Sequence, residues 1–202
     1  MRRRTLDFTI ATVGLVMALV LTASGVLLLY AANFTNQTIH DQLSAQKISF
    51  PPADQLPVKV YGETVNGYAG QQVTTGAQAK AYSDMISVHL SFVAGGKTYS
   101  EVSEAWIASN PTDPTKRDAA LGAQRETLFM GETLRGLLLN AYAFSIFGTI
   151  AFIGGWVAIV AALALFVLSI LGYVHGNKVK KERQLGDKAA ADAHADKQAV
   201  NA

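Results

Sequence analysis

The chain has 202 residues, of which 50% are hydrophobic, and its formal net charge is +2. It contains no cysteine, which excludes disulfides, thiolate metal sites, cysteine nucleophiles and a lipid anchor on cysteine. The apolar residues are concentrated in two long runs, so the composition indicates a membrane protein with one small domain of about 100 residues between two spans.

The first apolar run extends from Phe8 to Ala32, has no ionisable residue and follows Arg2-Arg3-Arg4. A helix of roughly 20 apolar residues crosses a bilayer core of about 30 Å, so this run is long enough to span. It is also longer than the roughly 7–15 apolar residues of a secretory signal, and Tyr30-Ala31-Ala32-Asn33 matches a cleavage site poorly. We therefore favour a permanent transmembrane helix at 8–32, preceded by a short cytoplasmic N-terminus at 1–7, over a cleaved signal peptide.

The residues after the first run are polar and still helical in pattern. Ile39 and Leu43 lie four residues apart among polar side chains, which predicts a helical extension over 33–47. Phe50-Pro51-Pro52 ends it, because proline cannot continue a helix. Residues 54–67 contain proline, glycine and Asn-Gly, and predict a loop with at most a short strand at 58–61.

Two further helices are expected before the second run. Apolar residues at spacings of three and four predict a helix over 75–92, which Gly95-Gly96 stops. Thr98 and Glu101 form a capping box that predicts a short helix ending at Asn110-Pro111. Asp113-Pro114 then predicts the start of a last helix that continues into the second run. The segment at 33–149 is therefore expected to be a mainly helical domain.

The second apolar run extends from Gly136 to Val174 without Asp, Glu, Lys or Arg, and a basic cluster at Lys178–Arg183 follows it. Divided in two, the run would give spans of fewer than about 20 residues and no polar turn, so we expect one span at 150–173. Basic residues next to a span stay cytoplasmic. The sequence thus predicts a mainly α fold: two antiparallel transmembrane helices, both termini cytoplasmic, an extracytoplasmic domain at 33–149, and a disordered cytoplasmic tail at 174–202.

Each predicted span carries a row of small residues on one face. Helices pack in lipid through such faces, because small side chains let backbones approach. Glycine and alanine are also common in apolar helices generally, but two matching rows favour contact between the spans. The candidate packing residues are Gly14, Ala18 and Gly25 in the first span, and Ala151, Gly155 and Ala158 in the second.

The stretch from Arg125 to Phe144, with Gly131-Glu132-Thr133-Leu134-Arg135-Gly136 at its centre, resembles a family of small two-pass membrane proteins from actinobacteria. The resemblance covers nearly the whole chain and includes the Phe50-Pro51-Pro52 break. It implies a bacterial plasma membrane and an outward-facing domain. The family has no assigned activity, so the resemblance implies nothing about catalysis. Glu132 and Arg135 can pair at i, i+3. Gly131 and Gly136 each lower helix stability by about 1 kcal/mol relative to alanine, which indicates close packing there or a bend. We expect the segment to pack closely against 33–47.

Few residues indicate chemistry. The segment between the spans has eight basic and ten acidic residues and no basic stripe, which argues against nucleic-acid binding. The four histidines lie in four separate segments, so no metal site is expected. An envelope enzyme would need Glu101, Glu104 or His89 to converge in a cleft, whereas solvated carboxylates are the commoner interpretation. Neither span has an ionisable residue, which argues against transport. We expect no catalytic residue, no cofactor and no metal.

The sequence therefore favours a non-enzymatic membrane protein that acts as an accessory or scaffold subunit of a membrane complex. The alternative is an extracytoplasmic domain on a two-span anchor that binds or senses a ligand or lipid. The expected partners are the lipid bilayer and other membrane proteins, or further copies of the same chain.

Overall fold

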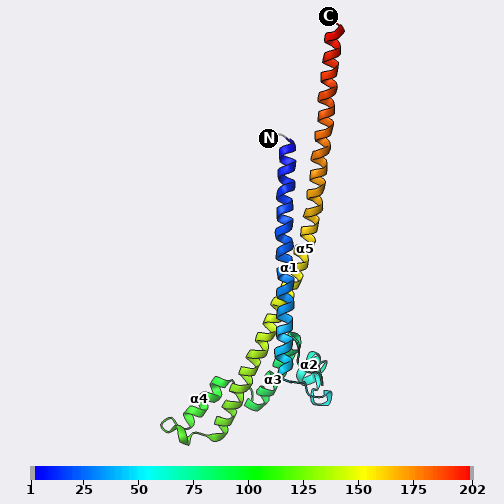
Figure 1. Cartoon of the computed structure of the whole chain (residues 1–202). Coiled ribbons are helices and arrows are strands. Elements are labelled where there is room, and N and C mark those ends of the chain that lie inside the picture. The colour runs from blue at the N-terminus through cyan, green and yellow to red at the C-terminus, as the bar shows by residue number, and fades with distance from the viewer. Residues whose placement is uncertain (1–2, 201–202) are drawn as a thin grey trace. The chain divides into compact units, whose positions relative to one another are not determined.

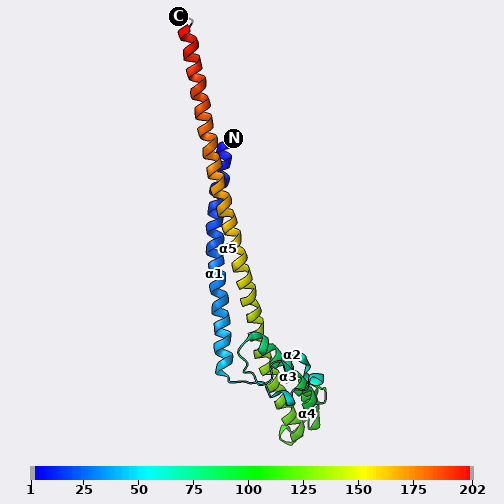
Figure 2. The same ribbon diagram turned by 90° about the vertical axis from the view of Figure 1, so that its right-hand side faces the viewer.

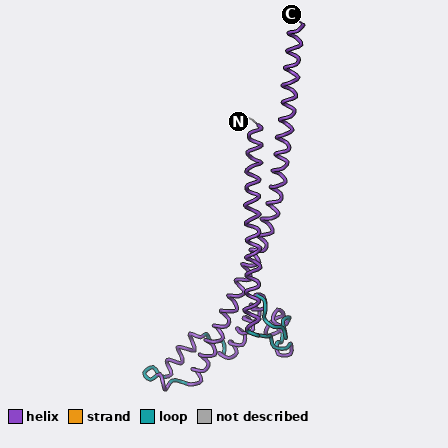
Figure 3. The backbone as a smooth tube through the Cα atoms, in the orientation of Figure 1, coloured by secondary structure: helices purple, strands orange, loops and turns teal. Residues whose placement is uncertain are grey.

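The computed structural model describes residues 3–200, and these residues are mainly helical, with no named strand among them. Figure 3 shows helices joined by loops along the described part of the chain. The helices are α1 (Arg3–Ala45), α2 (Val58–Asn66), α3 (Gly76–Ala94), α4 (Tyr99–Ser109) and α5 (Ala119–Val200), with short 3-10 turns η1 (Ala53–Gln55) and η2 (Pro114–Lys116). They are labelled in Figure 1.

The chain divides into two compact units, each described by itself. One, the paired-helix unit, consists of the start of α1 and the C-terminal part of α5, up to Tyr30 and from Ala151. Its two helical segments lie side by side in both Figure 1 and Figure 2. The other, the helical domain, extends from Ala31 to Ile150 and contains α2, α3 and α4.

Two helices are long and apolar enough to cross a membrane, over Leu6–Ala45 and Ala119–Gly186. Only 11% of the residues in the apolar window of each helix are buried. A core helix of a soluble protein would be mostly buried, so these windows expose their apolar side chains to the surroundings. The expectation of a mainly helical chain with two candidate spans is confirmed at this level.

The helical domain has two small apolar cores. The larger contains Ile39 and Leu43 of α1 and Leu138 of α5, together with Phe50, Leu56, Val65, Val73, Ala79 and Ala81. The Phe50 ring lies 5.6 Å from Tyr68 and 5.1 Å from Tyr82, centroid to centroid, so the residue before the two prolines anchors the chain reversal after α1. The smaller core joins α3, α4 and α5 through Leu90, Ala94, Val102 and Leu128.

The helix signals between 75 and 110 are confirmed. The α3 helix ends at Gly95, whose φ of 58° lies in the left-handed region that glycine adopts without strain. The capping box of α4 is present, with Thr98 accepting from the Glu101 amide and Glu101 reaching back. A second capping box, between Thr75 and Gln78, starts α3 and was not identified from the sequence.

Three expectations differ from the structure. The loop predicted at 54–67 contains α2, in which helical turns lie on both sides of Gly62 (φ 84°). The segment is held by burial of Val65 and by the hydrogen bond that Asn66 Nδ2 donates to the Leu56 carbonyl (2.9 Å). Asp113-Pro114 starts only η2, and Asp118 instead caps α5 by accepting from the Leu121 amide (2.8 Å). Within the tail predicted to be disordered, α5 continues to Val200, since its alanine, lysine and glutamine are strong helix formers.

Candidate packing surface and binding cavities

The closest helix–helix approach in the paired-helix unit joins Gly25 of α1 to Gly155 of α5. A Cβ atom added at Gly25 would lie 2.9 Å from the Gly155 carbonyl oxygen and 3.4 Å from the Ala158 Cβ. A Cβ atom added at Gly155 would lie 3.0 Å from the Gly25 carbonyl oxygen and 2.8 Å from the Leu29 Cγ. The two backbones are therefore in contact, and only glycine fits at either position.

Buried small residues recur every seven positions on both helices of this unit. On α1 they are Ala11, Ala18 and Gly25, and on α5 they are Gly155, Ala162, Ser169 and Gly176. A strict repeat of seven keeps one face of a helix turned toward a partner helix along its whole length. Many large side chains of the unit point the other way: Leu19, Leu27, Val157 and Leu168, for example, are each at least 60% exposed.

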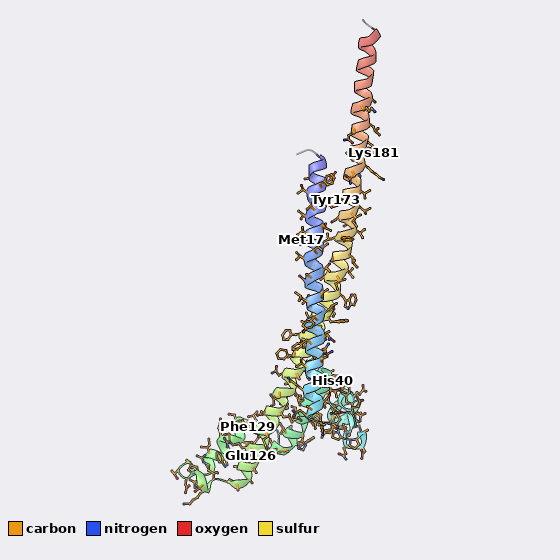
Figure 4. All side chains as sticks on the ribbon, viewed as in Figure 1. Met17, His40, Glu126, Phe129, Tyr173 and Lys181 are labelled. Atoms are coloured by element: carbon orange, nitrogen blue, oxygen red, sulfur yellow. The ribbon has the colours of Figure 1, made fainter. Side chains whose placement is uncertain are left out.

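Contacts along this face pair low residue numbers on α1 with high numbers on α5. Added Cβ atoms at Gly176, Gly172 and Gly14 would meet Phe8, Ala11 and Ser169, respectively. Beyond Gly14 the contacts pass to Gly25 with Ala158. At one end of the face Thr12 Oγ1 and the Tyr173 hydroxyl share a hydrogen bond of 2.7 Å, and the Phe8 ring lies 5.6 Å from the Tyr173 ring. Figure 4 labels Tyr173, and also Met17, which is 47% exposed.

The structure brings together part of the predicted packing set. Gly25, Gly155 and Ala158 meet, and Ala18 is buried at 3% exposure. Gly14 faces Ser169 of α5, and Ala151 is half-buried. Sequence reasoning missed Ala11, Ser169 and Gly176, although a search for a seven-residue spacing of small residues would have found them.

The segment from Gly131 to Gly136 lies in the helical domain and has several neighbours. An added Cβ at Gly131 would lie 2.5 Å from Leu90 Cδ2 of α3, and one at Gly136 would meet nothing within 4 Å. Arg135 pairs with Glu132 (2.7 Å) and donates from Nε to the Ser83 carbonyl of α3 (3.3 Å). The expectation that both glycines allow close approach to 33–47 is therefore wrong: Gly131 serves contact with α3, and Gly136 serves no contact.

The α1 extension meets α5 between Leu134 and Phe144, and a cavity of about 580 Å³ lies between the two helices. Among the described residues, neither Thr133 nor Asn140 forms a side-chain hydrogen bond with Asn33, Asn36 or Gln37. Thr133 Oγ1 donates to the Phe129 carbonyl, and Gln37 Nε2 donates to Asn33 Oδ1. The cavity is lined from α1 and the residues after it by Phe34, Thr35, Thr38, Ile39, Gln42, Leu43, Gln46 and Ile48, and from α5 by Leu134, Leu137, Leu138, Asn140, Ala141 and Phe144.

An aromatic and arginine cluster closes the α4–α5 end of the domain. The guanidinium groups of Arg117 and Arg125 lie 4.5 and 4.6 Å from the Trp106 ring centroid. Arg125 Nε also donates to Ser103 Oγ (3.2 Å). Beside them is a second cavity, of about 430 Å³, lined in part by Glu126 and Phe129, which Figure 4 labels. Arginine stacked on tryptophan contributes about 0.5–2 kcal/mol, so the cluster fastens α4 onto α5.

Glu101 and Glu104 form hydrogen bonds with residues at the start of α4. The Glu101 carboxylate accepts from the Thr98 amide (2.7 Å) and the Thr98 hydroxyl (2.8 Å), and these hydrogen bonds lower the pKa of Glu101 below its ordinary value of 4.5. Glu104 accepts from Ser100 Oγ (3.2 Å). Glu101, Glu104 and His89 line neither cavity of the domain. Among the described residues no three His, Asp or Glu side chains gather as metal ligands.

Comparison with known proteins identifies no relative of this chain. No protein family, no curated protein and no solved structure matches the chain.

Proposed function

We propose that this chain is a non-enzymatic integral membrane protein in which two antiparallel transmembrane helices hold a small helical domain outside the membrane. It acts as an accessory or scaffold subunit of a membrane complex. The observation that carries the proposal is the backbone contact between Gly25 and Gly155, made by helices whose outward faces are covered with large apolar side chains.

This distribution of side chains supports a lipid environment. In water the large apolar residues would be buried and the small ones would be free to lie outside, because burial of apolar area drives folding. In lipid that driving force between helices is absent, and close packing of small residues replaces it. The order of contacts, from Phe8 with Gly176 to Gly25 with Ala158, supports helices that cross the bilayer in opposite directions.

The orientation follows from charge. Basic residues stay on the cytoplasmic side, and here Arg2-Arg3-Arg4 precede the first span and Lys178 to Arg183 follow the second. Lys181 of this second cluster is exposed (Figure 4). The resemblance to actinobacterial two-pass proteins is consistent with the same orientation in a bacterial plasma membrane.

Cysteine labelling tests this orientation directly, because the chain has no cysteine of its own. Lys59→Cys and Ala108→Cys should react with a membrane-impermeant maleimide in intact cells or spheroplasts, whereas Ala189→Cys should react only after the membrane is opened. All three positions are exposed. Labelling of position 189 alone in sealed cells would contradict the proposal.

The scaffold role is tested by native electrophoresis of the detergent-extracted full chain, followed by mass spectrometry of the proteins in the same band. We expect a complex larger than one chain, with reproducible membrane-protein partners. A band of single-chain size under every mild detergent would contradict the accessory role.

A ligand-binding domain on the same two-span anchor is the second candidate function. The cavity between the α1 extension and α5 favours it, because about 580 Å³ lies within the roughly 300–1,000 Å³ of small-molecule sites.

A further inference from the structure

The cavity between the α1 extension and α5 has a buried apolar floor and an exposed apolar rim. Ile39, Leu43 and Leu138 of the floor are no more than 8% exposed, whereas Phe34, Leu137 and Phe144 of the rim are 61%, 64% and 53% exposed. Three large exposed apolar side chains around one hollow form a surface that an apolar ligand would cover. The hollow is therefore suited to a hydrocarbon body.

The lining carries no charge. None of its residues is Asp, Glu, Lys, Arg or His, and its polar members are threonine, glutamine and asparagine. The side-chain amides of Gln42 and Gln46 make no hydrogen bond to the other described residues, so they are available as neutral donors. An ionised group inside the hollow would lose its hydration without a partner. The occupant is therefore uncharged within the hollow, with at most a few hydrogen-bond acceptors.

Both walls continue directly into the proposed spans. Phe34 follows the end of the first apolar run by two residues on the unbroken helix α1, a rise of about 3 Å. Phe144 precedes Ile150 by six residues on α5, a rise of about 9 Å. Counted along each helix, the rim thus begins, at Phe34 and Phe144, within two turns of the proposed spans.

From these three features we propose that the hollow takes one acyl chain of a phospholipid from the outer leaflet. The chain lies on Ile39, Leu43 and Leu138, its ester carbonyl groups accept from the amides of Gln42 or Gln46, and the charged headgroup stays outside. This inference rests on the proposed two-span anchor, which brings the rim to the bilayer surface. It names the ligand class of the second candidate function.

Photochemical labelling of the full chain in phosphatidylcholine vesicles tests the inference. The probe is a phosphatidylcholine with a diazirine at the end of one acyl chain, and the adducts are located by mass spectrometry after digestion. We expect adducts in the spans and, in addition, on residues 34–48 and 134–144. Ala141→Trp fills the hollow from α5 and should reduce the second set at least about fivefold while leaving the span adducts unchanged.

A matched control and a second blocking variant keep the result interpretable. Ala143→Trp adds the same bulk two residues away on an exposed position that does not line the hollow, and should leave labelling as in the wild type. If Ala141→Trp fails to fold, Thr38→Trp blocks the hollow from α1.

The outcomes separate the inference from the anchor on which it rests. Adducts in the spans with none at 34–48 or 134–144, or hollow adducts that both blocking variants leave unchanged, would overturn the acyl-chain site and leave the anchor standing. Absence of adducts from the spans would overturn the anchor. If Leu137→Cys forms a disulfide-linked dimer in vesicles while the hollow stays unlabelled, a second copy of the chain covers this surface, which also overturns the proposal.

Discussion

The Gly25–Gly155 contact predicts that two neighbouring glycines of α5 respond differently to the same substitution. A methyl group at Gly155 would lie 2.8 Å from Leu29 Cγ and 3.0 Å from the Gly25 carbonyl oxygen. Carbon atoms in ordinary contact lie about 3.5–4.0 Å apart, so the helices must separate to admit it. A methyl group at Gly154 would lie 3.8 Å from Leu28 Cδ1, which is ordinary contact.

The magnitude follows from two terms. Each Gly→Ala change gains the same helix propensity, about 1 kcal/mol, so this term cancels between the two variants. Overpacking a close contact costs about 1–3 kcal/mol. We therefore expect Gly155→Ala to be less stable than Gly154→Ala by about 1–3 kcal/mol, and Gly155→Leu to be less stable still.

The assay is reversible separation of the two helices in mixed micelles as the fraction of dodecyl sulfate rises. Dyes on Leu6→Cys and Val179→Cys, both at exposed positions, report the separation as a loss of energy transfer. Equal transition midpoints for Gly154→Ala and Gly155→Ala would show that the backbones are not in contact and would refute the reasoning.

Three further predictions concern the helical domain. Gly131→Ala should lower the stability of the domain by up to about 2 kcal/mol, because the new methyl meets Leu90 Cδ2 at 2.5 Å and overpacking of about 1–3 kcal/mol is offset by about 1 kcal/mol of helix propensity. Leu90→Ala in the same chain should relieve part of the overpacking cost in a double-mutant thermal denaturation cycle. Arg125→Lys should destabilise it by about 0.5–2 kcal/mol, since lysine cannot stack on Trp106 as a planar group while bonding Ser103; a melting temperature equal to that of wild type would exclude this role. The hydrogen bonds from Thr98 lower the pKa of Glu101 in the folded state, so their stabilisation is present above the ordinary value of 4.5 and is lost as the pH falls through the lowered value. Thr98→Val should reduce that pH dependence and cost about 0.5–2 kcal/mol at neutral pH, and melting curves for the two proteins that stay parallel from pH 7 to acid would contradict the cap.

Several features of this protein were determined by local sequence. The two long uncharged runs predict helices that can cross a membrane, because length and apolarity alone meet that requirement. The α4 cap needs only Thr98 and Glu101 three residues apart, and the end of α3 needs only Gly95, so both could be found without any tertiary contact. The pairing of Glu132 with Arg135 is likewise a matter of spacing on one helix.

Other features depended on contacts between distant residues. That Gly131 faces Leu90 while Gly136 faces no side chain is set by how α5 packs on α3, and the two glycines look alike in the sequence. The α2 helix forms where proline and glycine predicted a loop, because burial of Val65 and the Asn66–Leu56 bond outweigh weak local propensity. The hollow between the α1 extension and α5 likewise exists only because Ile39 and Leu43 meet Leu138, almost 100 residues away in the chain, and no local pattern encodes a meeting of that kind.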